Sequence, residues 1–144
     1  TLALLEFNLA LVAISLAGCS TPMQHTFPNA DRSHLWTAMV ATANAPEYND
    51  DGIQGRWIVV ENDVDANPDQ ARIDVRREIT RILHLPRQKD QHDRREVKFS
   101  VYLLPTNPPT IEFISKSTYF IAVRGEIEAT RYFSAVNQML LPVE

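Results

Sequence analysis

The most regular pattern in the chain is an alternation of apolar and polar side chains over residues 71–85. Its apolar members share one parity: Ile73, Val75, Ile79, Leu83 and Leu85. A period of two indicates a strand with one buried and one solvated face, as in an antiparallel sheet. Arg77 and Arg81 fall on the apolar parity. We therefore expect a bulge, or an incompletely covered end of the strand, near these two arginines.

Three further segments have the composition of strands. Residues 56–61 are β-branched and aromatic, which predicts a strand buried on both faces, and a turn is expected at residues 63–70. Alternating apolar residues over 97–103 predict another strand. The prolines within residues 105–109 enforce a turn, because proline cannot donate to a sheet ladder. The last strand is expected at residues 111–116.

Helical periodicity flanks these strands on both sides. After a cap at Asn29 or Asp31, the apolar side chains of the first helix form one stripe: Leu35, Trp36, Met39, Val40 and Ala43. A second helix is predicted from Glu126 to about Leu141, and Pro142 closes it.

The order helix, four strands, helix predicts an α+β domain. Strands joined by short turns pair as an antiparallel meander, so the predicted sheet has four strands with both helices packed on one face. In element order this architecture is similar to the small helix-grip-like domains of bacterial envelope lipoproteins, such as those of the outer-membrane assembly machinery. That likeness concerns the fold and implies no activity.

The first 19 residues end in Leu16-Ala17-Gly18-Cys19, which contains the one cysteine of the chain. An apolar run over residues 9–17 precedes it. The run is too short for a transmembrane helix, which needs about 20 apolar residues. A helix buried in a soluble core is the alternative, although residues 2–17 offer almost no polar face. The length of the run, the small residues and the cysteine together resemble the signal peptide and lipobox of bacterial lipoproteins.

This resemblance implies that residues 1–18 are removed as a signal peptide and that Cys19 carries fatty acyl chains such as palmitate. Residues 19–30 then form a lipidated tether, and residues 31–144 form a single domain. Ser20 is compatible with passage to the outer membrane, where the domain would face the periplasm. Within the tether, Gln24 to Phe27 can also add a short edge strand.

Composition limits the classes of function. The 126 residues that follow the signal peptide are enough for one domain, and an acylated Cys19 leaves no thiol for a disulfide or for nucleophilic chemistry. The net charge of −4 gives no long-range attraction to nucleic acid. The sequence contains no Gly-x-Ser-x-Gly, phosphate-loop, dinucleotide-binding or His-Glu-x-x-His motif.

One window has regularly spaced oxygen-bearing side chains: Asp63, Asp65, Asn67, Asp69 and Asp74. They stand at positions 1, 3, 5, 7 and 12 of the window, which resembles a calcium loop of the EF-hand type. Pro68 occupies the position where such a loop has glycine, and the flanking segments are predicted strands. Asp, Asn and Pro are also typical of a solvated hairpin turn, which is the second interpretation.

Basic residues are frequent in the middle of the chain: Arg72, Arg76, Arg77, Arg81, Arg87, Lys89, Arg94 and Arg95. A patch formed by Arg72, Arg76, Arg94 and Arg95 would suit anionic lipid headgroups or an acidic partner. Acidic residues are interleaved with them, which favours cross-strand ion pairs on a wet sheet face instead.

Together these features predict a non-catalytic lipoprotein of the bacterial cell envelope. We expect a small membrane-tethered module for protein interaction or structure, with the membrane and another envelope protein as partners. The alternative is a module of the envelope that binds calcium or a small ligand. No other cofactor is predicted.

Overall fold

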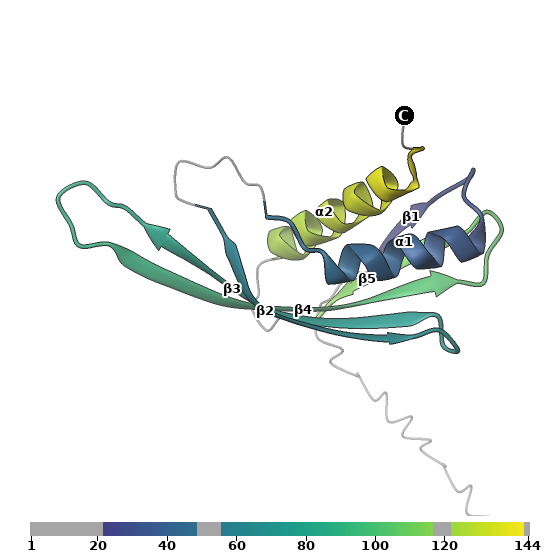
Figure 1. Ribbon diagram of the computed structural model, residues 1–144, viewed down its shortest axis with the longest axis horizontal. Helices are drawn as coiled ribbons and strands as arrows, with labels where there is room; N and C mark the ends of the chain where they lie inside the picture. The colour runs from purple at the N-terminus through teal and green to yellow at the C-terminus, as the bar shows by residue number, and fades with distance from the viewer. Residues whose placement is uncertain (1–21, 49–55, 117–121, 143–144) are drawn as a thin grey trace, which may run out of the picture.

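The computed structural model describes residues 22–48, 56–116 and 122–142, which form a sheet of five antiparallel strands under a layer of two helices (Figure 1). The strands lie in the order β1-β5-β4-β3-β2. In chain order the elements are β1 (Met23–Thr26), α1 (Arg32–Asn44), β2 (Ile58–Asn67), β3 (Arg72–Leu83), β4 (Gln91–Leu104), β5 (Thr110–Ser115) and α2 (Ala122–Leu140). The predicted α+β fold, with a meander and two helices on one face, is confirmed.

The fifth strand comes from the segment that the sequence assigns to the tether. β1 pairs with β5, so that Met23 lies opposite Phe113 and Thr26 lies opposite Thr110. This is the short edge strand that Gln24 to Phe27 offered as an alternative. Asp31 caps α1, because its carboxylate accepts a hydrogen bond from the His34 N–H at 3.1 Å.

Several predicted boundaries were wrong. β4 begins at Gln91, six residues before the predicted start at residue 97, and β3 ends at Leu83, two residues before the end of the predicted alternation. β2 continues to Asn67, through residues predicted to be a turn, and the turn itself spans residues 68–71. α2 begins at Ala122, four residues before Glu126, so the prediction missed its first turn. For residues 118–124 the sequence left a short strand and a loop as alternatives. Residues 118–121 lie outside the described residues, and both alternatives were wrong for 122–124, which are helical.

The core lies between the helices and the inner face of the central strands. α1 and α2 contact each other, and they cover the apolar side of β3, β4 and β5. Phe99 and Phe113 stack at its centre, with 4.6 Å between ring centroids. Alternation along β3 is as predicted, since Ile73, Val75 and Ile79 are buried.

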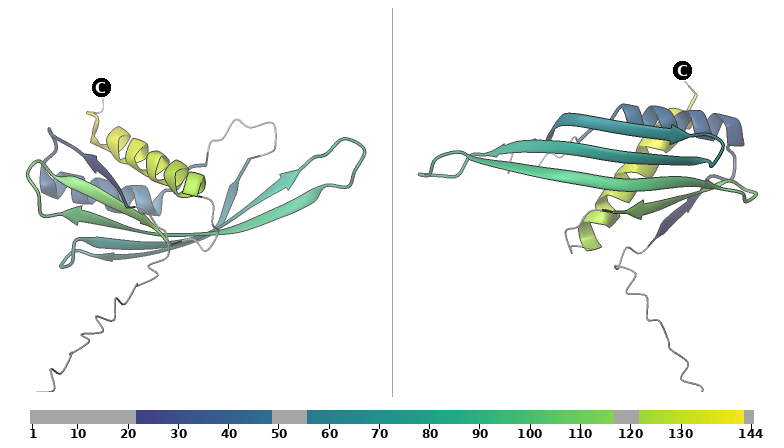
Figure 2. Two further views of the ribbon diagram at one scale, coloured as in Figure 1. Left: turned by 180° about the vertical axis from the view of Figure 1, so that it is seen from behind. Right: turned by 90° about the horizontal axis from the view of Figure 1, so that it is seen from below.

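The β3–β4 hairpin is longer than the helix layer and projects past it (Figures 1 and 2). β2 begins at Ile58, opposite Thr80, so beyond that level the described β3 pairs with β4 alone. We call residues 80–94 of this hairpin the arm. No described helix covers it, which agrees with the prediction of an incompletely covered strand end near Arg81.

The bulge predicted near Arg77 is on the neighbouring strand. The pairing of β2 with β3 shifts between Val59 and Glu61, directly opposite Ile79 and Glu78. The prediction that residues 56–61 are buried on both faces was wrong, because Ile58 and Val60 are about 60% exposed. β2 is an edge strand at the base of the arm, where no described element covers one of its faces.

Replacing Phe113 by alanine is expected to lower the free energy of unfolding by about 3–5 kcal/mol, because it removes a fully buried ring and leaves a cavity beside Phe99. Urea denaturation measures the change. The control Ile58→Ala, at an exposed position, should change it by no more than about 0.5 kcal/mol. Equal effects of the two substitutions would contradict this assignment of the core.

Candidate interaction surfaces

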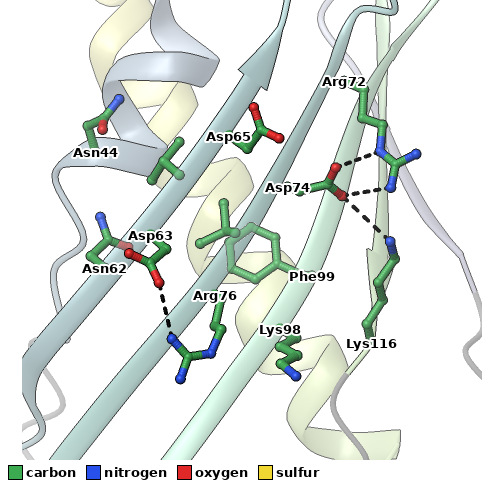
Figure 3. A pocket seen from close by; sticks show the side chains of 12 residues that line it. Asn44, Asn62, Asp63, Asp65, Arg72, Asp74, Arg76, Lys98, Phe99 and Lys116 are labelled. Atoms are coloured by element: carbon green, nitrogen blue, oxygen red, sulfur yellow. Dashed lines mark hydrogen bonds and ion pairs between the residues drawn. The ribbon is translucent and has the colours of Figure 1, made fainter.

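No described element covers the sheet face opposite the helices (Figure 2), and this face carries many charged side chains. We call it the outer face. Its charged side chains come mainly from three neighbouring strands: Glu61, Asp63 and Asp65 of β2, Arg72, Asp74, Arg76 and Glu78 of β3, and Arg94, Glu96 and Lys98 of β4. A hollow of about 660 Å³ is lined by six of these charged side chains and by Lys116 just after β5 (Figure 3). Its other lining residues are uncharged and belong to α1 or to the helix side of the sheet: Asn44, Asn62, Val64, Val75 and Phe99.

Arg76 joins the three strands at one end of the hollow. Its Nε–H donates to Glu96 at 3.0 Å, and its Nη1 lies 3.1 Å from an Asp63 oxygen and 3.4 Å from a Glu61 oxygen. Glu96 also pairs with Lys98. Hydrogen bonds from Lys98 and then Arg76 hold the pKa of Glu96 below its usual value. A guanidinium shared by three carboxylates has a fixed orientation.

Asp74 is the centre of a second group at the other end of the hollow (Figure 3). Its carboxylate accepts one hydrogen bond from Arg72 Nη2 at 2.9 Å and one from the Ser100 hydroxyl. Arg72 Nε at 2.8 Å and Lys116 Nζ at 3.5 Å lie at ion-pair distance from it. Partial burial would raise the pKa of Asp74, but the bonds from Ser100 and Arg72 outweigh it and lower the pKa. Asp74 is therefore an ionised and well-satisfied anion.

The structure does not form a loop from the five residues of the predicted calcium window. Asp63, Asp65 and Asn67 lie along β2, Asp69 is in the turn, and Asp74 is on β3. Asp63 and Asp74 instead belong to the two ion-pair groups at opposite ends of the hollow. Within the described ranges, no group of three or more His, Cys, Asp or Glu side chains is placed to hold a metal ion.

The predicted basic patch is divided between the two faces of the sheet. Arg72, Arg76 and Arg94 are on the outer face, where Arg94 pairs with Glu78. Arg95 is on the helix side, because its parity on β4 matches the buried Phe99 and Val101. The three outer arginines each contact a carboxylate, so on this face the alternative of cross-strand ion pairing describes the arrangement.

The helix side of the arm base carries a stacked cluster that the sequence analysis missed. The guanidinium carbons of Arg81 and Arg95 lie 4.4 and 4.8 Å from the centre of the Trp57 ring. Both arginines also bind the same Asp93 oxygen, at 3.0–3.2 Å. One feature of the sequence could have indicated this cluster: Arg81 falls among the alternating residues that face the helices. A cation on that side needs an aromatic or acidic neighbour.

Arg77 is buried where the core meets this cluster, with 4% of its surface exposed. Its donors bind neutral oxygens: Asn62 Oδ1 at 2.7 Å, the Ala43 carbonyl at 2.9 Å and the Tyr48 hydroxyl at 3.4 Å. It also lies over the Phe99 ring. Burial raises the pKa of Tyr48 to about 12, so this hydroxyl stays neutral.

Cys19 and the apolar run before it lie outside the described residues, so the lipobox stays a prediction. Among the helices that are described, none has the length and apolar character needed to cross a bilayer.

Comparisons with known proteins identify no family. No family model matches the chain, and no curated protein matches it. Among solved structures, the crystal structure of protein CV1439 from Chromobacterium violaceum is similar at 10% sequence identity and a TM-score of 0.44. The match covers 86% of this chain and 99% of that chain. Similarity at this level carries no conclusion about function.

The Asp93 cluster predicts a loss of stability in acid. Partial burial raises the pKa of Asp93, but the bonds and charges of Arg95 and Arg81 outweigh it, so the folded-state pKa lies below the unfolded value of about 3.9. Its contribution is therefore complete above about pH 4 and is lost as the pH falls through the folded-state pKa.

Asp93→Asn should lower the free energy of unfolding by about 1–2 kcal/mol at pH 7, with a difference that disappears in acid. Urea titrations at a series of pH values measure this. Asp69→Asn, which removes an exposed carboxylate in the β2–β3 turn, is the control. A difference for Asp93→Asn that persists at the lowest pH would contradict the assignment.

Proposed function

We propose that this protein is a non-catalytic lipoprotein of the bacterial cell envelope whose domain binds another protein through the outer face of the sheet. The lipobox Leu16-Ala17-Gly18-Cys19 supports the anchor. It would hold the domain at a membrane, with the outer membrane facing the periplasm as the expected location. The absence of a catalytic motif from the sequence supports a binding role.

The observation that carries the proposal is the organisation of the outer face. Arg76 and Asp74 each hold several charged neighbours in defined positions across three strands. Fixed charges of both signs favour a partner with the complementary pattern and penalise other partners. Because the side chains are already ordered, binding costs less conformational entropy than it would at a flexible surface.

A small-ligand site is the second candidate, since the hollow's 660 Å³ falls within the common range of about 300–1,000 Å³. Small-molecule sites are mostly apolar and enclosed, however, with a few polar groups. Seven of the twelve residues that line this hollow are charged, and most of these already form ion pairs. A broad, polar protein surface suits it better. A thermal shift with a small anion or cation, and none with protein, would favour the second candidate.

Replacing Cys19 by serine is expected to release the protein from the membrane. Serine has no thiol to form the thioether that links the lipid. The apolar run at residues 9–17 alone would bind the membrane less stably than two acyl chains do. Membrane fractionation and mass spectrometry of the mature N-terminus measure the effect, with Ser20→Ala as the neighbouring control. An unmodified Cys19 that still follows residues 1–18 would overturn the proposed anchor.

Charge reversal on the outer face should separate partner binding from folding. Asp63→Lys places a second cation beside Arg76 and should weaken partner binding at least tenfold. Stability should change by no more than about 1 kcal/mol, because this ion pair is exposed. The readout is the partner recovered by cross-linking in membranes.

The matched control is Glu126→Lys, at an exposed position of α2 in the helix layer. It makes the same change in net charge and should leave partner binding unchanged. If both variants lose the partner equally, or neither does, the outer face is not the binding surface.

A further inference from the structure

The turn at the end of the arm carries an arginine in an unfavourable backbone conformation. The Gln88 N–H donates to the Leu85 carbonyl at 3.3 Å, with Pro86 and Arg87 in the middle of the turn. Arg87 has a φ of 61°, a position that such turns usually give to glycine or asparagine. Strain of this kind persists where the side chain has a use. Ala71 also has a positive φ, but its side chain packs on the core, whereas Arg87 is exposed.

The tip of the arm is locally cationic, although the chain has a net charge of −4. Arg87 and Lys89 are both exposed. Within the described part of the chain, neither has a carboxylate at ion-pair distance, in contrast to the arginines of the outer face. Asp90, the acidic residue of this turn, is hydrogen-bonded to His84 Nδ1 at 2.8 Å instead. The two cations are therefore available to an anionic surface.

Exposed apolar side chains accompany these cations. Leu85 in the turn is 38% exposed, and Ile82 behind it is 42% exposed. Ile82 shares the outer face with Thr80 and hence with Ile58, which lies directly opposite Thr80 and is 61% exposed. Apolar residues edged by unpaired cations are typical of a surface that binds the headgroup region of an anionic bilayer.

The chain enters the sheet from the same end as the arm. β1 runs antiparallel to β5, and β5 runs antiparallel to β4, so β1 and β4 have the same direction. Because β4 begins in the arm, Met23 is at the end of β1 that faces the arm. The four residues from Cys19 to Met23 reach at most about 14 Å. From the level of Met23, which is that of Val101, β4 extends about 34 Å to Gln91.

These lengths orient the domain at a membrane. An arm pointing straight at the bilayer would exceed the reach of the tether, so the strands must be inclined to the surface. An inclined domain with its anchor at this end brings the arm to the headgroups. The outer face of the arm at Ile82, together with the neighbouring Ile58 of β2, is the apolar side available to meet them.

We propose that the tip of the arm, with Leu85, Arg87 and Lys89, is a second membrane contact that docks on anionic phospholipid in the bilayer holding the Cys19 anchor. The orientation in this inference rests on the anchor of the proposed function, while the composition of the tip stands apart from it. Protein binding through the rest of the outer face is compatible with a docked tip, because the hollow is bordered by residues outside the arm.

The test places a fluorescent reporter at the tip of the mature lipoprotein, reconstituted in vesicles. Acylation of Cys19 leaves a Gln88→Cys variant with one free thiol, which takes an environment-sensitive dye. Nitroxide-labelled lipids should quench the dye in vesicles of phosphatidylcholine with phosphatidylglycerol, and much less in phosphatidylcholine alone. Added salt should reduce the quenching. A label at Gln70→Cys, in the β2–β3 turn at the opposite end of the sheet, should stay unquenched.

A double substitution tests the cations without damaging the turn. Arg87→Gly suits the backbone conformation and should preserve or raise the melting temperature. Combined with Lys89→Gln, it should lower the ratio of docked to free tip about tenfold, since each cation near an anionic surface contributes appreciably. Equal quenching in the two kinds of vesicle, or none in either, overturns the proposal, as does quenching that the double substitution leaves unchanged.

The failure of the anchor would be visible separately. If mass spectrometry finds Cys19 without lipid, the proposed anchor is wrong, and Cys19→Ser then restores a single labelling site. The quenching measurement with the full chain still decides whether the tip meets anionic lipid. If Cys19 is acylated and the tip label does not respond, the anchor stands and the second contact is wrong.

Discussion

The structure depends on a mismatch of length between the helices and the strands they cover. A helix rises about 1.5 Å per residue, so α1 and α2 are about 20 and 28 Å long. At about 3.4 Å per residue, the 14 residues of β4 span about 48 Å. Two helices packed across the sheet therefore cannot cover the whole hairpin. Hydrophobic burial stabilises one end of it, and other interactions must stabilise the remainder.

Polar contacts replace apolar packing where the helices end. Arg77 is the first residue of this transition, and its buried guanidinium is satisfied by oxygens from α1, the segment after it and β2. Further toward the arm, Trp57 lies against Arg81 and Arg95, and both arginines bind Asp93. Cation–π contacts and charge-assisted hydrogen bonds tolerate partial solvent access better than an apolar core does. The arm is thus held to the domain by a graded series of contacts.

The sequence predicted the fold because its strongest signals were local and periodic. The alternation over residues 71–85 follows directly from a sheet with one wet face, and Arg77 and Arg81 marked the level at which the cover ends. The extent of β2 was missed because Asp63, Asp65 and Asn67 are typical of turns. The apolar Val64 and Ala66 between them carried the period-two signal, and they do pack on the core. Pairing with β3 therefore outweighed the intrinsic preference of the Asp and Asn residues for a turn.

The functional surfaces were harder to predict, since they depend on pairing across strands. Arg72, Arg76 and Arg94 looked like a basic patch, yet register decides that each faces a carboxylate of a neighbouring strand or of its own. Register also puts Arg95 on the opposite face from Arg94. Once these pairs are formed, the outer face has little net attraction for an anion. The arrangement of its positive and negative charges, rather than their sum, then determines which partner it can bind. Arg87 and Lys89 differ because they stand beyond the last strand pair, where none of the described strands brings a carboxylate. The difference in length between helices and strands thus leaves the arm without a helical cover and its terminal cations without a carboxylate partner in the described residues. The outer face, where charges are paired, suits a protein partner with a complementary pattern of charges. The tip, where they are not paired, suits a uniformly anionic membrane.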